Sequence, residues 1–361
     1  MSFPFGERLR AAFAPPQYLA RSFAGIDLSA SGVKAARLAA GVHGLTLAGW
    51  AEIFLAAGAF ADGEIVDQGA VVAALAGTAH SAGITTANAS LPESKSFLFE
   101  TEVPGAAADE LRVAVEQHLD ELIPLPPAET VFDFVAIGEG KGGGTRVAGV
   151  GVAGRVIDDA LKAFDDAKMS VAALEGEMFA MARALIRPDD MATSLIVDVG
   201  KTTTKLAIVA GRIPLFSATI AIGGHALTLA VQKYFGVTEN EARGVKADRG
   251  IVPTAGNEEY LAAMLSTVSA IRDEIMRRLD YWQEKARASG HEPVERALLT
   301  GGNASVRGLP EYLEGALGVP VMMGDVFTNL ASRDAWIPEI DSTEAPAYAT
   351  AIGLALYDAY A

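Results

Sequence analysis

The chain has 361 residues, of which 50% are hydrophobic and 20% charged, so it is long and apolar enough to form two folded domains and is not a disordered protein. Its net charge of −16 argues against binding to nucleic acid, which requires a basic surface, and against broad contact with an anionic membrane. Cysteine is absent, which excludes disulfides, thiolate zinc sites and cysteine nucleophiles and is compatible with the cytoplasm.

Residues 1–21 are a candidate N-terminal extension in which aromatic and leucine side chains alternate with arginines. The pattern favours a flexible tail that packs one or two aromatic rings over an amphipathic membrane contact. A signal peptide is not expected, because Glu7 and Pro15 interrupt any apolar core. The longest uncharged stretches, such as residues 345–357, are shorter than the roughly 20 residues of a transmembrane helix.

Strands and a helix follow in the first part of the chain, with strands expected at residues 23–28, 33–39, 44–54 and 86–92 and a helix at 66–81. These elements belong to residues 22–95, which together with residues 171–193 form the first of two predicted lobes. A helix over residues 174–185 returns the chain to this lobe and carries Glu177 near its start.

A separate βαββα unit is predicted at residues 96–170, inserted in the first lobe. Its elements are strands at 97–103, 131–137 and 146–153 and helices at 107–123 and 156–168, with prolines ending the first helix and a glycine-rich tip at 138–144.

The second lobe is predicted at residues 194–235 and 293–361, and residues 236–292 form its helical upper part. Its expected elements after the first hairpin are strands at 220–225 and 296–300 and helices at 226–235, 239–248, 258–288 and 309–317. The 258–288 helix has one apolar stripe without sustained heptads, which indicates a core helix and not a coiled coil.

One short pattern occurs twice: a hydrophobic strand ending in Asp, a turn of small and hydroxyl residues, and a second strand opening with Lys. The first copy runs from Asp27 to Lys34 and the second from Asp198 to Lys205, each over seven positions, at an offset of 171. One such hairpin alone could be an ordinary β-turn. The repetition favours two related halves with phosphate-gripping turns that face each other.

Each hairpin has the chemistry of a phosphate-binding turn. Small residues let backbone N–H groups approach phosphate oxygens, hydroxyls add donors, and Lys adds a compact positive charge. The carboxylates of Asp27 and Asp198 fit instead as outer-shell holders of hydrated Mg²⁺, which keeps several waters when it bridges phosphates. The predicted nucleotide-binding residues of the two hairpins are Asp27, Ser29, Ala30, Ser31, Gly32, Val33, Lys34, Asp198, Gly200, Lys201, Thr202 and Thr203.

A third element is the strand at 296–300, which runs into Gly301-Gly302-Asn303. Two glycines let the backbone pass close to a flat ligand such as adenine or ribose. Because Gly-Gly marks many turns, its position after the two hairpins is the informative feature.

Together these elements resemble the actin-like ATPase superfamily, an α/β fold whose two lobes have duplicated sheet-and-helix cores around a nucleotide cleft. Within it the chain is similar to the PilM family of type IV pilus assembly proteins, in the FtsA-like branch, over roughly residues 22–358. The two hairpins, Ile222-Gly223-Gly224 and the segment 347–356 carry this similarity.

The resemblance implies that ATP or ADP binds with Mg²⁺, with further contacts from Gly223, Gly224, Lys246, Gly301, Gly302 and Asn303. It gives Glu177 the catalytic role of orienting the attacking water; as a plain helix residue, Glu177 would only favour the N-terminal dipole. Two positions depart from the pattern, because Leu28 stands where relatives have Gly and Arg243 where they have Glu. The chain is therefore expected to be at most a slow ATPase.

Three classes of function remain open. The first, which the PilM resemblance implies, is a cytoplasmic scaffold held at the inner membrane by the N-terminal tail of a PilN-like bitopic membrane protein. That tail would dock beside residues 97–122, and pilus motor or platform proteins would be further partners. The second is an FtsA-like filament or division protein, and the third is a sugar or acyl kinase, which would need a base aligned with a substrate hydroxyl.

Overall fold

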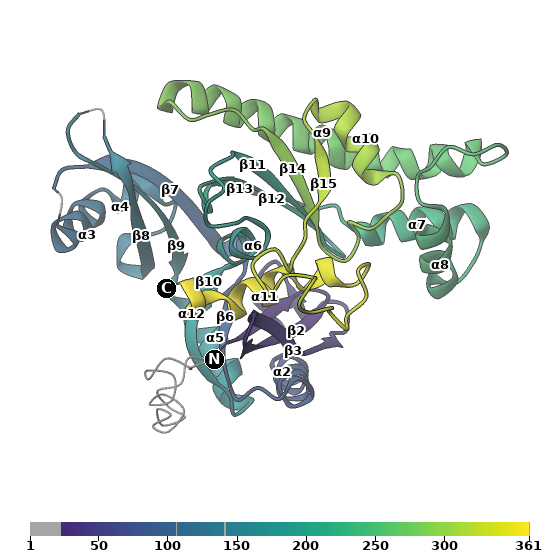
Figure 1. Cartoon of the computed structure of the whole chain (residues 1–361), viewed down its shortest axis with the longest axis horizontal. Helices are drawn as coiled ribbons and strands as arrows, with labels where there is room; N and C mark the ends of the chain where they lie inside the picture. The colour runs from purple at the N-terminus through teal and green to yellow at the C-terminus, as the bar shows by residue number, and fades with distance from the viewer. Residues whose placement is uncertain (1–22, 106, 141, 361) are drawn as a thin grey trace, which may run out of the picture.

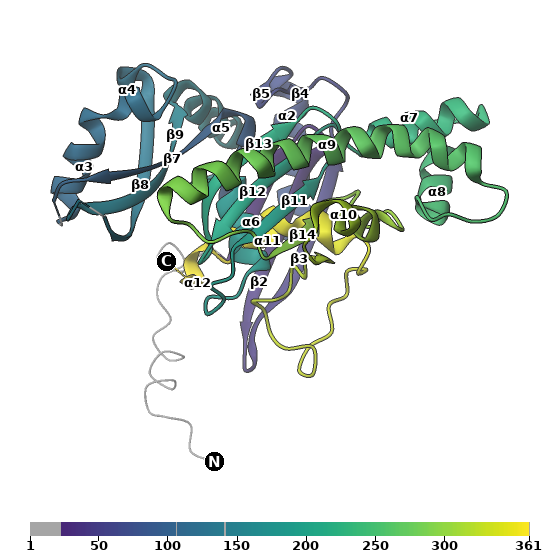
Figure 2. The ribbon, with the colours of Figure 1, turned by 90° about the horizontal axis from the view of Figure 1, so that it is seen from above.

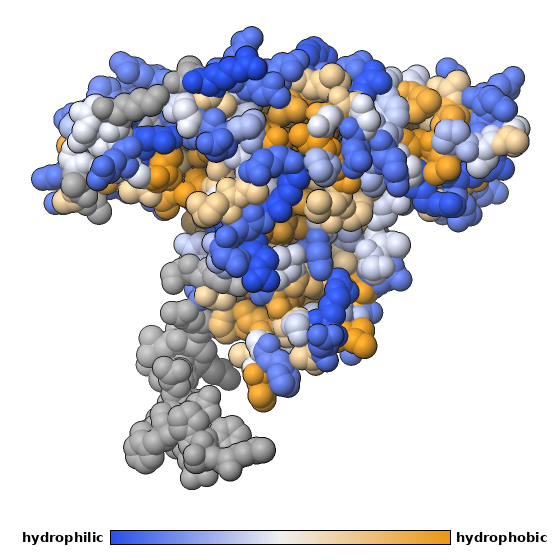
Figure 3. All heavy atoms as spheres, turned by 45° about the horizontal axis from the view of Figure 1, so that its top comes forward, coloured by the Kyte–Doolittle hydropathy of each residue, from blue (hydrophilic) through white to orange (hydrophobic). Residues whose placement is uncertain are grey.

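The computed structural model describes residues 23–360 except 106 and 141, so the predicted extension at residues 1–21 lies outside the described residues. Two five-stranded sheets form the centre of the chain, and the outline resembles a T, with the first sheet in the stem (Figures 1 and 3). In the part of the chain that is described, no helix is long and apolar enough to span a membrane.

The first sheet has the strand order β10-β6-β1-β2-β3. Strands β1, β2 and β3 are antiparallel neighbours, whereas β6 and β10 run parallel to β1. The strands are β1 (Ala24–Ser29), β2 (Gly32–Gly41), β3 (Gly44–Phe54), β6 (Thr86–Leu91) and β10 (Ser170–Gly176).

The second sheet repeats this topology in the order β13-β12-β11-β14-β15. Strands β11, β12 and β13 are again antiparallel neighbours, and β14 and β15 run parallel to β11. The strands are β11 (Ser194–Val199), β12 (Thr204–Ala210), β13 (Ile213–Ile220), β14 (Arg296–Thr300) and β15 (Val321–Met323). The predicted duplicated core is therefore confirmed.

Two helices, α6 (Glu177–Leu185) and α11 (Ala349–Ala355), fill the space between the sheets. They cross without a side chain at the contact, because a Cβ on Gly353 would lie 1.8 Å from the Ala180 carbonyl oxygen. A Cβ on Gly25 of β1 would likewise lie 2.0 Å from the Ala351 carbonyl oxygen. Backbone therefore packs directly on backbone at the centre of the molecule.

The second sheet is covered on its other face by α7 (Gly224–Phe235), α9 (Glu258–Ser289) and α10 (Leu309–Leu317), with α8 (Glu239–Arg249) beside α7. Helix α9 crosses the top of the molecule from α7 and α8 at one end to the inserted unit at the other (Figure 2). Most of the predicted apolar stripe of α9 is buried, with Trp282 and Ile275 fully inaccessible.

The inserted unit is a three-stranded sheet, order β7-β9-β8, covered on one face by two short helices. It comprises β7 (Ser96–Val103), α3 (Ala108–Gln117), α4 (Leu119–Leu122), β8 (Thr130–Glu139), β9 (Thr145–Ala153) and α5 (Gly154–Asp166), as the βαββα prediction expected. Phe164 of α5 packs in the core of the first sheet, so this helix ties the unit to that sheet.

The uncovered face of the insertion contacts the second half of the chain. His291, after α9, lies 2.7 Å from Glu100 Oε2 on β7, and Arg146 on β9 pairs with Glu100 at 2.5 Å. The side chains of His291 and Glu100 are nearly buried. Ala148 of β9 joins the core cluster of the second sheet.

Three predicted elements differ from the structure. The helix at 107–123 is divided at His118 into α3 and α4. Residues 174–176 end strand β10, so the helix begins only at Glu177. Residues 220–225 are not a strand, because β13 ends at Ile220 and α7 starts at Gly224. Strand β10 forms because it pairs with β6, and β13 forms because it pairs with β12. Local sequence patterns do not show these tertiary pairings.

The remaining elements are one helix that packs on the first sheet and several short connecting elements. They are α2 (Gln68–Ala82), packed on β2 and β3, the two-stranded β4 (Phe60–Ala61) and β5 (Glu64–Ile65), α12 (Tyr357–Tyr360), and the 3-10 turns η2 (Glu93–Lys95), η3 (Pro127–Glu129) and η4 (Ala345–Tyr348). Helix α2 corresponds to the predicted helix at 66–81. It starts at an Asp67 side chain that accepts from the Ala70 N–H.

Candidate nucleotide site

The two predicted hairpins are structurally equivalent. Asp27 of β1 is the register partner of Lys34 of β2, and Asp198 of β11 is the register partner of Lys205 of β12. Both hairpins join the first two strands of sheets that share one topology. The repeat read from the sequence is therefore also a repeat in space.

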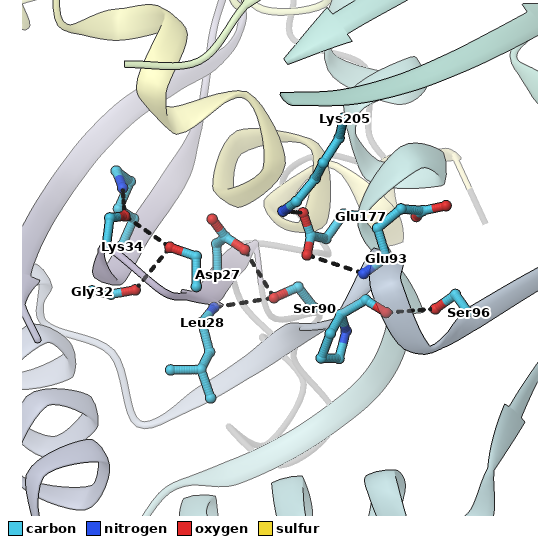
Figure 4. A network of polar contacts seen from close by, with 12 residues as sticks. Asp27, Leu28, Gly32, Lys34, Ser90, Glu93, Ser96, Glu177 and Lys205 are labelled. Atoms are coloured by element: carbon cyan, nitrogen blue, oxygen red, sulfur yellow. Dashed lines mark hydrogen bonds and ion pairs between the residues drawn. The ribbon is translucent and has the colours of Figure 1, made fainter. Parts of the chain in front are cut away.

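The first hairpin uses its polar side chains internally. Ser29 Oγ lies 2.9 Å from Ser31 Oγ and donates to the Gly32 carbonyl oxygen at 3.2 Å. Lys34 Nζ donates to Ser31 Oγ at 3.2 Å and pairs with Glu52 of β3 at 2.9 Å. Lys34 is thus held by its own sheet (Figure 4).

Ser90, at the end of β6, fixes the carboxylate of Asp27. Its hydroxyl donates to Asp27 Oδ1 at 2.9 Å and accepts from the Leu28 N–H at 3.1 Å (Figure 4). Leu28, the predicted departure from the family pattern, is buried in the core of the first sheet. Its side chain therefore points away from the carboxylate, and the departure does not crowd Asp27.

The second hairpin packs against the Gly223-Gly224 segment. The Gly200 N–H donates to the Thr203 carbonyl oxygen at 3.0 Å, and the Gly224 N–H donates to the Gly200 carbonyl oxygen at 2.9 Å. A Cβ on Gly223 would lie 2.7 Å from the Lys201 carbonyl oxygen. Only glycine permits this approach, so the two predicted glycines shape the second turn.

Lys246 of α8 lies behind this turn and makes three hydrogen bonds. Its Nζ donates to the Gly224 carbonyl oxygen at 3.1 Å, Thr228 Oγ1 at 3.0 Å and Asn303 Oδ1 at 2.7 Å. Asn303 Nδ2 in turn donates to the Gly200 carbonyl oxygen at 3.0 Å. Four predicted residues from distant parts of the sequence are therefore brought together here.

Among the described residues, no carboxylate is hydrogen-bonded to Lys246. All three of its acceptors are neutral, and burial lowers its pKa to about 8, with Arg243 adding to the effect. Arg243 instead pairs with Glu239 at 2.5 Å. These three acceptors use all three N–H donors of the ammonium, so an oxygen of a ligand would bind Lys246 by replacing one of them.

Glu177 begins α6 and is 3% exposed. One of its carboxylate oxygens pairs with Lys205, and the other accepts from the Glu93 N–H at 3.3 Å (Figure 4). Burial raises the pKa of Glu177 to about 7, and the charges of Asp27 and Glu93 add to the rise while Lys205 opposes it. The sequence predicts Lys205 as a positive charge for phosphate and not as a partner of Glu177, and it gives Glu93 no role.

Asp27, Glu93, Glu177, Asp198 and Lys205 form one group of charges, called the interlobe cluster below. Burial and the charge of Asp27 raise the pKa of Asp198. Burial alone would lower the pKa of Lys205, but the carboxylates of Glu177, Asp198 and Asp27 outweigh it and hold that pKa above its ordinary value. The cluster therefore joins the two hairpins electrostatically.

The Gly301-Gly302 turn lies against the second hairpin. Gly301 has φ +93°, and a Cβ there would lie 2.2 Å from Asp198 Oδ1. Its N–H donates to the Pro346 carbonyl oxygen at 3.0 Å, before α11. The predicted Gly301-Gly302 turn therefore lies next to the Asp198 carboxylate.

Some predicted contacts have little accessible side chain. Val33 is fully buried in the core of the first sheet, so only its backbone is available to a ligand. Ala30 also packs on that core, whereas Thr202 is exposed.

A cavity of about 1060 Å³ lies on the second lobe beside the Gly301-Gly302 turn. Ala304, Ser305 and Pro346 line it, together with Ile251 and Phe327. It does not include Asp27, Asp198 or Glu177. It is therefore adjacent to the Gly301-Gly302 turn and separate from the interlobe cluster.

The residues fit an ion that is bound largely through water. Within residues 23–360, apart from 106 and 141, no group of three or more His, Cys, Asp or Glu side chains is arranged to hold a metal directly. Asp27 and Asp198 supply two carboxylates, and Lys246 supplies an ammonium with neutral acceptors. This donor set suits a hydrated Mg²⁺ accompanied by phosphates more than a cage made by protein alone.

Comparisons with known proteins agree with this geometry. The solved structure of a PilM–PilN type IV pilus biogenesis complex has 22% identity and a TM-score of 0.74, covering 92% of this chain and 97% of that one. MreB5 of Spiroplasma citri bound to AMPPNP has 15% identity and a TM-score of 0.53, covering 96% and 97%. These likenesses show the actin-like ATPase fold.

Sequence comparisons give the family. Cell division protein FtsA of Rhizobium meliloti (strain 1021) is 22% identical over 214 residues, which is 53% of this chain; the chain matches 46% of that relative's length. The family model described as type IV pilus assembly protein PilM matches residues 25–359, nearly the whole described chain. The chain therefore belongs to the PilM family of type IV pilus assembly proteins.

Proposed function

We propose that this protein is an ATP-binding scaffold of the type IV pilus assembly platform, located in the cytoplasm and held at the inner membrane by a PilN-like partner. The observation that carries the proposal is the family match over residues 25–359. The contacts of Lys246 and Asn303 with the second hairpin, and the effect of the Asp27 charge on Asp198, support the nucleotide part.

The residues have separable roles toward Mg-ATP or Mg-ADP. Backbone N–H groups of the two turns bind phosphate oxygens, because such runs form anion-binding concavities. Asp27 and Asp198 hold the hydrated ion, which when bound neutralises phosphate charge. Lys246 and Asn303 contact the ribose of the nucleotide, and the Gly301-Gly302 turn lies beside its adenine base.

Nucleotide binding is tested by thermal unfolding with ATP or ADP, with and without Mg²⁺. A ligand at a hundred times its dissociation constant adds about 2.7 kcal/mol to the free energy of unfolding. An unchanged midpoint at millimolar Mg-ATP and Mg-ADP would contradict the nucleotide part of the proposal.

Hydrolysis is expected to be slow, well below the roughly 1–100 s⁻¹ of protein kinases. Glu177 is the residue proposed to orient the attacking water, yet Lys205 and the Glu93 N–H occupy both of its oxygens. A rapid transfer of phosphate from ATP to a sugar or small acid in a coupled assay would favour the kinase alternative.

The partner peptide is proposed to bind as an extended segment beside the insertion. Strand β8 is the open edge of the β7-β9-β8 sheet, whereas β7 faces the second sheet through Glu100 and His291. Val131 and Val135 of β8 are 51% and 49% exposed. Extended peptides gain affinity from main-chain hydrogen bonds to such an edge and specificity from alternate side chains.

Point substitutions test the partner better than deletion of the insertion, since Phe164 of α5 belongs to the core of the first sheet. The substitution Val135→Asp is expected to weaken binding of the N-terminal cytoplasmic peptide of the PilN-like protein at least tenfold. Val42→Asp, in the turn between β2 and β3, changes a valine that is 96% exposed and lies outside the insertion, so it is the matched control and should bind normally. Equal affinity of both variants would contradict the proposed edge.

A further inference from the structure

The two equivalent lysines of the duplicated hairpins have different partners. Lys34 pairs with Glu52 on the neighbouring strand of its own sheet, where the two are register partners. Lys205 leaves its sheet and pairs with Glu177 at the start of α6, which directly follows β10 of the first sheet. Only the second lysine therefore links the two halves (Figure 4).

The ammonium of Lys205 is the cationic member of the interlobe cluster. Besides Glu177, the carboxylates of Asp27 and Asp198 act on it strongly enough to keep it charged despite its burial. These same two aspartates are the proposed holders of Mg²⁺. The ammonium of Lys205 and a divalent cation from solution would therefore interact with the same two carboxylates, those of Asp27 and Asp198.

We infer that Lys205 is a built-in counter-ion of the interlobe cluster, which substitutes for the divalent cation in the nucleotide-free protein and competes with it when it binds. This inference rests on the proposed nucleotide and Mg²⁺ site. It adds Lys205 as a residue that lowers the dependence of nucleotide binding on a divalent cation. Like charges repel at short range. A divalent cation near Asp27 and Asp198 therefore weakens the hold of Lys205 on that cluster and frees an oxygen of Glu177.

The consequence is a site with a reduced need for metal. With Lys205 present, part of the negative charge of the cluster is already neutralised, so ATP without metal meets less repulsion. Without Lys205, the carboxylates repel ATP⁴⁻ more strongly and attract a divalent cation more strongly. The ratio of the dissociation constants for ATP in EDTA and in Mg²⁺ therefore measures the role of Lys205.

The first arm of the test uses the full chain and metal alone. Nucleotide-free wild-type protein, Lys205→Met and Lys233→Met are titrated with Mn²⁺, followed by the electron paramagnetic resonance signal of the free ion. Lys233 is exposed on α7 and serves as the charge-matched control. Lys205→Met is expected to bind Mn²⁺ at least tenfold more tightly than the other two; equal affinities would overturn the inference.

The second arm measures ATP affinity calorimetrically in EDTA and in Mg²⁺. The ratio of the two dissociation constants is expected to rise at least tenfold in Lys205→Met and to stay near the wild-type value in Lys205→Arg, which keeps the charge. A ratio in Lys205→Met within twofold of wild type overturns the inference. If wild-type protein binds no nucleotide, the proposed function fails, and the Mn²⁺ arm still decides the role of Lys205.

A folding defect is controlled by a double variant. Glu177→Gln with Lys205→Met removes both members of the buried pair and leaves no unpaired charge at their contact. Asp27 and Asp198 are still without their ammonium in this protein, so tighter Mn²⁺ binding is again expected. Wild-type Mn²⁺ affinity in the folded double variant would overturn the inference.

Discussion

Replacing Gly353 with alanine should strongly destabilise the protein, because α11 has no room for one more methyl group. The new Cβ would lie 1.8 Å from the Ala180 carbonyl oxygen, whereas real Cβ contacts do not fall below 3.0 Å. Helices α6 and α11 would therefore have to separate by about 1 Å in the core between the sheets. Over-packing of this kind costs about 1–3 kcal/mol and occasionally more, and a backbone oxygen cannot rotate away, so we expect about 3 kcal/mol.

A matched glycine shows what the same change does without a clash. Gly315 lies within α10, and a Cβ there would meet nothing within 4 Å. Gly315→Ala should raise the free energy of unfolding by about 0.5–1 kcal/mol through helix propensity. In thermal melts followed by circular dichroism, a change of about 1 kcal/mol corresponds to about 2–4 °C in large domains. Gly353→Ala should thus melt at least about 6 °C below wild type; a midpoint equal to that of Gly315→Ala would refute this account of the helix crossing.

Three further predictions concern the site. Asp198→Asn should abolish the Mg²⁺ dependence of nucleotide binding with little change in melting temperature. Calorimetric titrations in Mg²⁺ and in EDTA test this. Unchanged Mg²⁺ dependence would show that Asp198 does not hold the ion. Nucleotide affinity in wild type should fall as pH rises above about 8, because Lys246 then loses its proton, and Lys246→Met should lack this fall; identical pH profiles would remove Lys246 from the site. The pKa of Glu177 is raised in the folded state, so its contribution to stability is present below pH 4.5 and is lost as pH rises to about 7. Glu177→Gln should therefore flatten the free energy of unfolding, measured by denaturant titration, over this pH range. An unchanged slope would contradict the raised pKa.

Local sequence patterns predict the hairpins, the inserted unit and the long helix α9, because their signals lie within short windows. The duplicated topology followed from matching Asp27 and Lys34 with Asp198 and Lys205. Strands β10 and β13 were not predicted, since their pairing with β6 and β12 depends on distant residues.

The same limit applies to the candidate site. Residues within the repeated motif were found, but Ser90 and Glu93 come from segments without a motif and reach Asp27 and Glu177 only through folding. The different partners of Lys34 and Lys205 also depend on tertiary neighbours, namely Glu52 and Glu177. Sequence equivalence therefore predicted equivalent positions and not equivalent contacts.

The place of α11 has a consequence for protein synthesis. This helix, late in the sequence, fills the core between two sheets whose first strands were translated long before it. Until residues 349–355 leave the ribosome, α6 is the only one of these two helices available to cover the inner faces of the sheets, and the apolar surface that α11 buries stays exposed. Folding of the two halves is then completed by one late event, and a nascent chain that stalls before α11 would be a substrate for chaperones and proteases.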